Sequence, residues 1–97
     1  MANPYQFKLY VCGESKRSRA AVMTVQQMLA QQLQDLYELD IIDIIKNPHL
    51  AGENNILVSP TLIKLSPPPE KRILGDFSNH DQIMSILFEK GWGLAEQ

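Results

Sequence analysis

Residues 18–36 form a long helical pattern, and a strand-like segment lies on each side of it. This stretch contains neither Gly nor Pro. Its apolar side chains recur at spacings of three and four, the period of one helix face, at Val22, Val25, Leu29, Leu33 and Leu36. We therefore predict one amphipathic helix. Ser15 or Ser18 is its expected N-cap, because a serine hydroxyl can accept a hydrogen bond from a free N–H group of the first turn.

The two flanking segments are predicted to be strands. Residues 7–12 are rich in strand-forming side chains and stop at Gly13. Residues 37–45 combine β-branched residues with apolar side chains on both faces, which is typical of a strand covered on both sides of a sheet. A strand, a helix and a strand in succession predict a right-handed parallel unit.

The pattern after Asn47 is less regular. Pro48 fits the first position of a short helix that extends to about residue 55. Residues 56–58 and 62–65 are strand-like and are separated by Ser59-Pro60-Thr61. Three prolines at 67–69 would then interrupt a strand, and residues 72–74 are predicted to form one more short strand before Gly75.

An apolar stripe predicts a last helix after the capping residues 76–78. Its members are Ile83, Met84, Ile86, Leu87 and Phe88, of which Ile83, Ile86 and Leu87 are expected to pack on the sheet. The complete order, βαβαββα, is that of a thioredoxin-like α/β fold. Because 97 residues are too few for two independent cores, residues 1–97 are expected to form a single domain.

Charge and composition argue against several classes of function. Nine Lys and Arg against eleven Asp and Glu give a net charge of -2, too balanced to predict nucleic acid or an anionic membrane as a partner. One cysteine and two histidines provide neither an internal disulfide nor a metal-ligand spacing, and no cofactor is expected. Without a membrane-spanning segment or an apolar signal-peptide core, the chain is expected to be cytoplasmic.

Five short motifs in one register carry a resemblance to a known family. They are Lys8-Leu-Tyr-Val-x-Gly13, Tyr37-x-Leu-x-x-Ile42-Asp43, Lys46-Asn-Pro-x-Leu-Ala51, Ile56-Leu-x-x-Pro60-Thr-Leu-x-Lys64 and Arg72-x-x-Gly75-Asp76-x-Ser78. Together they extend from Lys8 to about Asp81. On these motifs the sequence resembles the KaiB family of the cyanobacterial circadian clock and of related bacterial operons.

The resemblance implies a non-catalytic binding protein that can switch folds. Its ground state would have the order βαββααβ and form tetramers, whereas a rarer thioredoxin-like monomer would bind partners. The thioredoxin-like form would bind the ATPase ring protein KaiC and sequester KaiA. It would also displace the sensor kinase SasA, whose own N-terminal domain is similar to this chain. Two packings that differ by a few kcal/mol suffice for such a switch.

The same resemblance implies two sets of functional residues. The expected partner-binding residues are Tyr37, Asn55, Lys64, Lys71 and Arg72. The expected fold-switch residues are Pro60, Gly75, Asp76, Ile86 and Phe88.

The sequence departs from the family pattern in two places. Asp40 and Asn55 stand where family members commonly carry Lys, which reduces the basic surface expected to contact the ring. Residues 85–90 replace a segment that commonly contains Gly and Asp, and apolar residues in place of Gly favour a helix by a few tenths to about 1 kcal/mol each. We therefore expect mainly the thioredoxin-like form, as a monomer or weak dimer, with the tetramer confined to the alternative fold.

Cys12 supports a different function. With Ser15 it forms C-x-x-S at a strand-to-helix turn, where monothiol glutaredoxin-like proteins place their nucleophile. A helix N-terminus and the cations Lys16, Arg17 and Arg19 favour a thiolate there, and Pro60 matches the cis-proline position of this fold. A small buried cysteine is the structural alternative. A third function is a stand-alone kinase adaptor of the SasA-domain type.

Two further features have alternatives that the sequence leaves open. Lys16, Arg17 and Arg19 could hold an anion at the helix start, although solvated surface cations are the commoner case. Trp92, between two glycines, is either a terminal contact on the core or an exposed contact residue.

Overall fold

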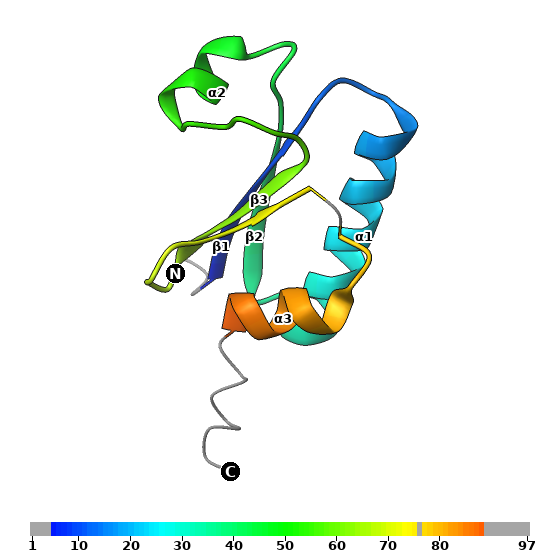
Figure 1. Cartoon of the computed structure of the whole chain (residues 1–97). Coiled ribbons are helices and arrows are strands. Elements are labelled where there is room, and N and C mark those ends of the chain that lie inside the picture. Colours follow the sequence, from blue (N-terminus) through cyan, green and yellow to red (C-terminus); the bar gives the residue numbers. More distant parts are fainter. Residues whose placement is uncertain (1–4, 76, 89–97) are drawn as a thin grey trace.

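The secondary structure follows the predicted order. The computed structural model describes residues 5–75 and 77–88. Its elements are β1 (Tyr5–Val11), α1 (Lys16–Leu33), β2 (Tyr37–Asp43), α2 (Pro48–Glu53), β3 (Thr61–Ser66), β4 (Lys71–Leu74) and α3 (His80–Phe88) (Figure 1). The order βαβαββα is therefore confirmed. Asp76 and Trp92, both singled out in the sequence, lie outside the described residues.

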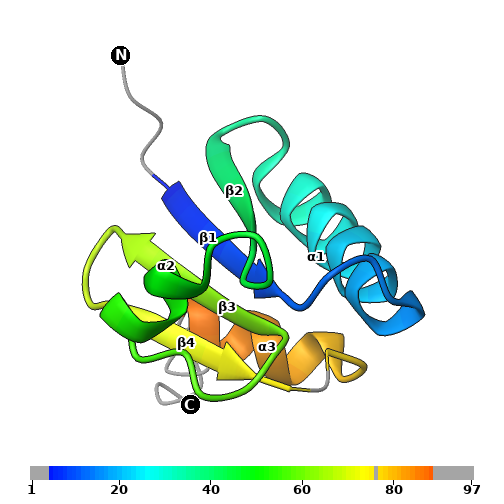
Figure 2. The ribbon, with the colours of Figure 1, turned by 90° about the horizontal axis from the view of Figure 1, so that it is seen from above.

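The sheet is mixed and has two open edges. Its strand order is β2-β1-β3-β4. β1 lies parallel to β2 and antiparallel to β3, and β3 pairs antiparallel with β4 (Figure 2). The predicted parallel unit of β1, α1 and β2 is confirmed, because the pairing advances in the same direction along both strands, from Tyr5 opposite Tyr37, through Leu9 opposite Ile41, to Val11 opposite Asp43. On its other side Leu9 faces Leu62 of β3, so β1 lies inside the sheet while β2 and β4 form its edges.

The two faces of the sheet carry cores of different size. Alternate residues of β1 point to one face and pack with α1 and α3 in a large apolar cluster, which includes Phe7, Leu9, Val11, Val25, Leu29, Leu62, Ile83 and Leu87. On the opposite face Tyr10, Ile56 and Ile63 form a smaller cluster, partly covered by Leu50 of α2. Figure 1 shows α2 near one end of the sheet, away from α1 and α3. Burying each large apolar side chain contributes about 1.5–3 kcal/mol, so the larger cluster, on the face covered by α1 and α3, supplies most of the core.

α1 begins as predicted and ends earlier than predicted. Ser15 is its N-cap, and the Ser15 hydroxyl accepts a hydrogen bond from the Ser18 backbone N–H at 3.1 Å. The helix stops at Leu33 because Gln34 adopts a positive φ of 60°. Leu36, predicted to lie on the apolar stripe, is therefore beyond the helix and exposed.

Two strand predictions were wrong. Residues 37–45 were predicted to be covered on both faces, but β2 is an edge strand and none of its residues is buried. Ile41 remains 42% exposed, because the strand order leaves β2 with one neighbour. Residues 56–58 were predicted to be a strand, but they form an irregular connection from α2 to β3. In that connection Leu57 and Val58 are exposed, and Ile56 enters the smaller core.

α3 packs through fewer residues than predicted. Ile83 and Leu87 are buried in the main core, as predicted. Ile86 is 39% exposed, so its predicted packing on the sheet was wrong. α2 begins at Pro48, as predicted. None of the helices in the described part of the chain has the length and apolar character required to cross a membrane.

Candidate partner-binding surface

Three of the predicted partner-binding residues lie together at one edge of the sheet. Asn55, Lys71 and Arg72, which we call the β4 edge surface, bring together the start of the α2–β3 connection and β4. The Arg72 guanidinium Nη1 donates to the Asn55 carbonyl at 3.3 Å, and its Nε donates to Glu70 Oε2 at 3.4 Å. The first of these bonds connects β4 to a segment distant in sequence. The Arg72–Glu70 pair is exposed, and such pairs stabilise a fold by about 0–1 kcal/mol.

Lys71 and Arg72 differ in the face of the sheet to which they point and in their exposure to solvent. Successive side chains of a strand point to opposite faces of the sheet, so these two cations flank the edge from both sides. Lys71 is half-buried and Arg72 is exposed. Asn55 has a positive φ of 55°, a conformation that Asn tolerates better than most residues. The surface therefore combines two cations with a backbone carbonyl and the neighbouring Glu70 carboxylate.

The structure separates the other two predicted partner-binding residues from this surface. Lys64 is 4% exposed, and its ammonium donates to the Pro67 carbonyl at 2.6 Å. In this conformation its charge does not lie on the surface, because β3 is an inner strand. Tyr37 lies on β2, at the opposite edge of the sheet, where its ring packs edge-on against Phe7 with centroids 6.5 Å apart. The five residues therefore do not form one site.

Two expected fold-switch residues contact each other where β4 ends. The Gly75 backbone N–H donates to the Pro60 carbonyl at 2.9 Å. Pro60 is buried and its peptide bond to Ser59 is cis, as its match to the cis-proline position predicted. Gly75 has a φ of 80°, which L side chains rarely adopt. This contact fastens the end of β4 to the start of β3.

The remaining fold-switch residues of the described chain lie on α3. Phe88 is half-buried, and its ring meets that of Tyr5 edge-on with centroids 5.5 Å apart. Ile86 contributes little to the core, as its exposure shows. Phe88 thus connects the end of α3 to the start of β1.

Asp43 connects the ends of β1 and β2 through its side chain. Its carboxylate Oδ1 accepts hydrogen bonds from the Gly13 and Ile45 backbone N–H groups, both at 2.9 Å. The bond from Gly13, then the one from Ile45, lowers the pKa of Asp43, because both stabilise the charged form. The sequence suggested no role for this residue beyond its motif. The parallel pairing explains it, because β1 and β2 end side by side.

The side chain of Tyr10 is completely buried. It packs with Ile56 and Ile63 in the smaller cluster, on the face of the sheet that α2 partly covers. Within the described residues its hydroxyl has no hydrogen-bond partner. Burial raises the pKa of Tyr10, while nearby Arg72 acts in the opposite direction. Tyr10 therefore lies below the β4 edge surface without reaching the solvent.

Cys12 is exposed at the end of β1. Its backbone is held on both sides by Ser18, whose hydroxyl accepts from the Cys12 N–H at 3.2 Å and donates to the Cys12 carbonyl at 3.1 Å. The predicted structural alternative, a small buried cysteine, was wrong. Over residues 5–75 and 77–88, no three His, Cys, Asp or Glu side chains come together as a metal site would require.

Similarity to known proteins identifies the family of this chain. Residues 8–88 match the KaiB domain. The chain belongs to the KaiB family. It is 42% identical to the circadian clock oscillator protein KaiB of Trichodesmium erythraeum over 89 residues, which cover 89% of this chain and 86% of that one. It is also 42% identical to that of Thermosynechococcus vestitus over 95 residues, which cover 95% of this chain and 88% of the relative.

Solved structures agree on the fold of this KaiB-family chain. The N-terminal domain of Synechococcus elongatus SasA has a TM-score of 0.72 at 24% identity, covering 92% of this chain and 88% of that domain. Chloroplastic thioredoxin z has a TM-score of 0.71 at 20% identity, with coverages of 90% and 78%. The resemblance to the KaiB family and the thioredoxin-like fold are therefore both confirmed.

Family membership favours one of the predicted functions. As a KaiB-family member, the chain is a homologue of circadian clock oscillator proteins. The similarity to thioredoxins is low in sequence and concerns the fold alone. The glutaredoxin-like function of Cys12 is therefore not supported.

Replacing Cys12 by Ser tests this conclusion. Because the side chain is exposed and Ser18 holds only the backbone, Cys12→Ser should change the free energy of unfolding by less than about 1 kcal/mol. Denaturant unfolding, together with a glutathione-dependent reductase assay of both proteins, measures the effect. Reductase activity that is present in the wild type and lost in the variant would contradict the prediction.

Proposed function

We propose that this protein is a binding module that docks, in its thioredoxin-like state, on a KaiC-type ATPase ring and thereby modulates a circadian or related timing system. The observation that carries the proposal is a KaiB-family chain in the thioredoxin-like arrangement, the state in which the family is expected to bind its partners. KaiA and a SasA-type kinase are the further expected partners. We also propose that the chain acts as one cytoplasmic domain, as a monomer or weak dimer.

The β4 edge surface is the proposed contact with the ring. Arg72 is exposed on an edge strand and is oriented by Glu70 and the Asn55 carbonyl, so it is already positioned to meet an acidic partner. Charged groups at the rim of an interface steer association and determine specificity more than they add affinity. Lys64 is left out of this surface because its side chain is buried, and Tyr37 is left out because it lies at the other edge.

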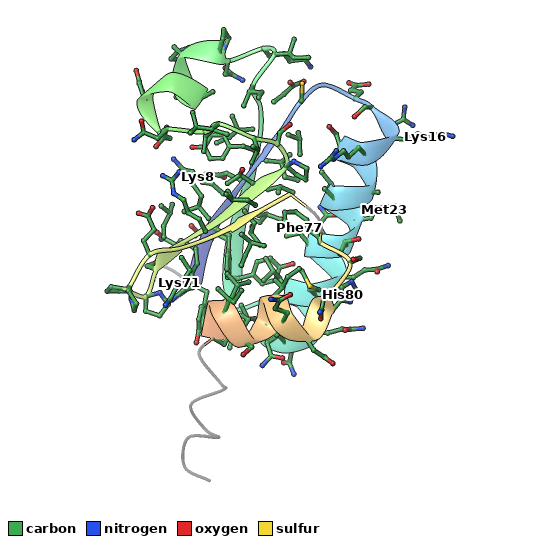
Figure 3. The ribbon with its side chains drawn as sticks, viewed as in Figure 1. Lys8, Lys16, Met23, Lys71, Phe77 and His80 are labelled. Carbon is green, nitrogen blue, oxygen red and sulfur yellow. The ribbon has the colours of Figure 1, made fainter. Side chains whose placement is uncertain are left out.

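Charge reversal at the β4 edge surface tests the proposal. Lys71→Glu combined with Arg72→Glu should weaken binding to a purified KaiC-type ring by about tenfold or more, because two attractive charges become repulsive. Lys16→Glu combined with Arg19→Glu is the matched control, since it makes the same charge change at the start of α1. Figure 3 shows Lys16 and Lys71 at opposite ends of the molecule.

Size-exclusion binding assays and circular dichroism of all three proteins provide the measurement. If the β4 variant binds like the wild type while both remain folded, the surface assignment is wrong. If the wild type binds no KaiC-type ring, the proposed function itself fails.

A kinase adaptor of the SasA-domain type is the second candidate. It is favoured by the similarity of fold to the SasA N-terminal domain. The two candidates differ in what the protein retains in a pull-down assay, a ring ATPase in the first case and a kinase alone in the second.

A further inference from the structure

A cavity of about 500 Å³ opens between α1 and the segment that connects β4 to α3. Its apolar lining comes from Ala21, Pro60 and Phe77, all of which are buried. Figure 3 shows Phe77 beside α1 and His80 at the start of α3. Cavities that hold small molecules have volumes of roughly 300 to 1,000 Å³, and this cavity falls within that range.

Two basic side chains line the cavity from different elements. Arg17 belongs to the first turn of α1, and His80 is the first residue of α3. Both are exposed, and neither side chain makes a hydrogen bond or an ion pair within the described part of the chain. The described residues of the lining include no carboxylate. The cavity therefore presents the Arg17 guanidinium and the His80 imidazole above an apolar floor, with no carboxylate among its described residues.

We propose that this α1–α3 cavity binds a small organic anion, namely a phosphate monoester or a carboxylate attached to a compact apolar body. The planar Arg17 guanidinium can donate two parallel hydrogen bonds to such an oxyanion, and the His80 imidazole can donate another. The apolar body would rest on Ala21, Pro60 and Phe77, where burial removes its surface from water. This site is separate from the β4 edge surface and does not depend on ring binding.

Titration with phenyl phosphate, followed by amide chemical shifts of the ¹⁵N-labelled chain, tests the proposal. We expect saturable shifts at residues 17–24 and 77–80. Phenol, which lacks the anion, and inorganic phosphate, which lacks the apolar body, should each bind at least about tenfold more weakly. Benzoate in place of phenyl phosphate determines whether carboxylates are also accepted.

Three variants distinguish binding of phenyl phosphate in the cavity from nonspecific attraction to positive charge on the surface. Arg17→Gln should weaken phenyl phosphate binding about tenfold, since it removes a charge-assisted hydrogen bond. Lys16→Gln, the matched control from the same helix turn, should change binding less than about twofold, since Lys16 does not line the cavity. Ala20→Leu should also weaken binding about tenfold without a change of charge, because Ala20 lines the cavity and is exposed.

Three results would overturn the proposal. They are shifts that do not saturate, equal losses of binding in Arg17→Gln and Lys16→Gln, and unchanged binding in Ala20→Leu. Because Ala20 is at the surface, its replacement leaves the core intact, so the cavity is tested even if Arg17→Gln proves unstable.

Discussion

Ile83→Ala is expected to lower the free energy of unfolding by about 2–5 kcal/mol, the range for truncating a large apolar side chain in a core. Ile83 is 3% exposed and joins α3 to the cluster formed by β1 and α1. Ile86→Ala is the matched control on the same helix. Its side chain is 39% exposed, so the same change should cost less than about 1 kcal/mol.

Denaturant unfolding of the two variants measures this difference. It tests which face of α3 packs on the sheet and therefore tests the thioredoxin-like arrangement directly. Equal losses of stability, or a larger loss for Ile86→Ala, would mean that residues 80–88 do not pack as the structure describes.

Ile86→Gly combined with Phe88→Asp is expected to raise the population of the alternative βαββααβ fold. Gly in place of Ile86 weakens the helix by up to about 1 kcal/mol. Removing the Phe88 ring loses its edge-on contact with Tyr5, worth about 0.5–1.5 kcal/mol, together with part of a buried ring. A combined change on the order of 2–3 kcal/mol alters a two-state ratio by roughly 30-fold to 150-fold, which is enough to reveal a second fold that lies within a few kcal/mol.

Backbone chemical shifts provide the measurement for this second prediction. The wild type should show helix over residues 83–88 and strand over residues 62–65 in a mainly monomeric sample. The double variant should add a second set of signals and a larger oligomer. Ile86→Ala combined with Phe88→Leu is the control, since it keeps helix propensity and an apolar side chain. A wild-type tetramer with strand shifts near residue 88, or a double variant that only unfolds, would contradict the fold-switch hypothesis.

Local signals were sufficient to predict the order of the elements. The spacing of Val25 and Leu29 predicted α1, the hydroxyl of Ser15 predicted its cap, and Pro48 predicted the first residue of α2. Each of these signals acts within one or two helical turns. The motifs that carried the family resemblance are likewise short segments of sequence, and the match over residues 8–88 confirmed them.

Local signals were not sufficient to predict which residues are exposed. β2 carries Leu39, Ile41 and Ile42, yet it lies at an edge because β3 pairs with the other side of β1. The same strand order buries Lys64 and brings Tyr10 beneath α2. Ile86 and Ile83 belong to one apolar stripe, but the sheet is in contact with only part of it.

The sequence by itself determined the helices, four strands, their order and the family, although it also predicted a strand over residues 56–58 that does not form. Caps, periodicity and short motifs are properties of neighbouring residues, which is why the sequence alone reveals them. Only the tertiary structure decided which predicted partner-binding residues share a surface and which side chains line a common cavity. Asn55 meets Arg72, and Arg17 lines the same cavity as His80, through pairings between segments far apart in the chain. Such pairings depend on strand order and helix docking, which arise from burying the whole core at once and leave no local mark in the sequence.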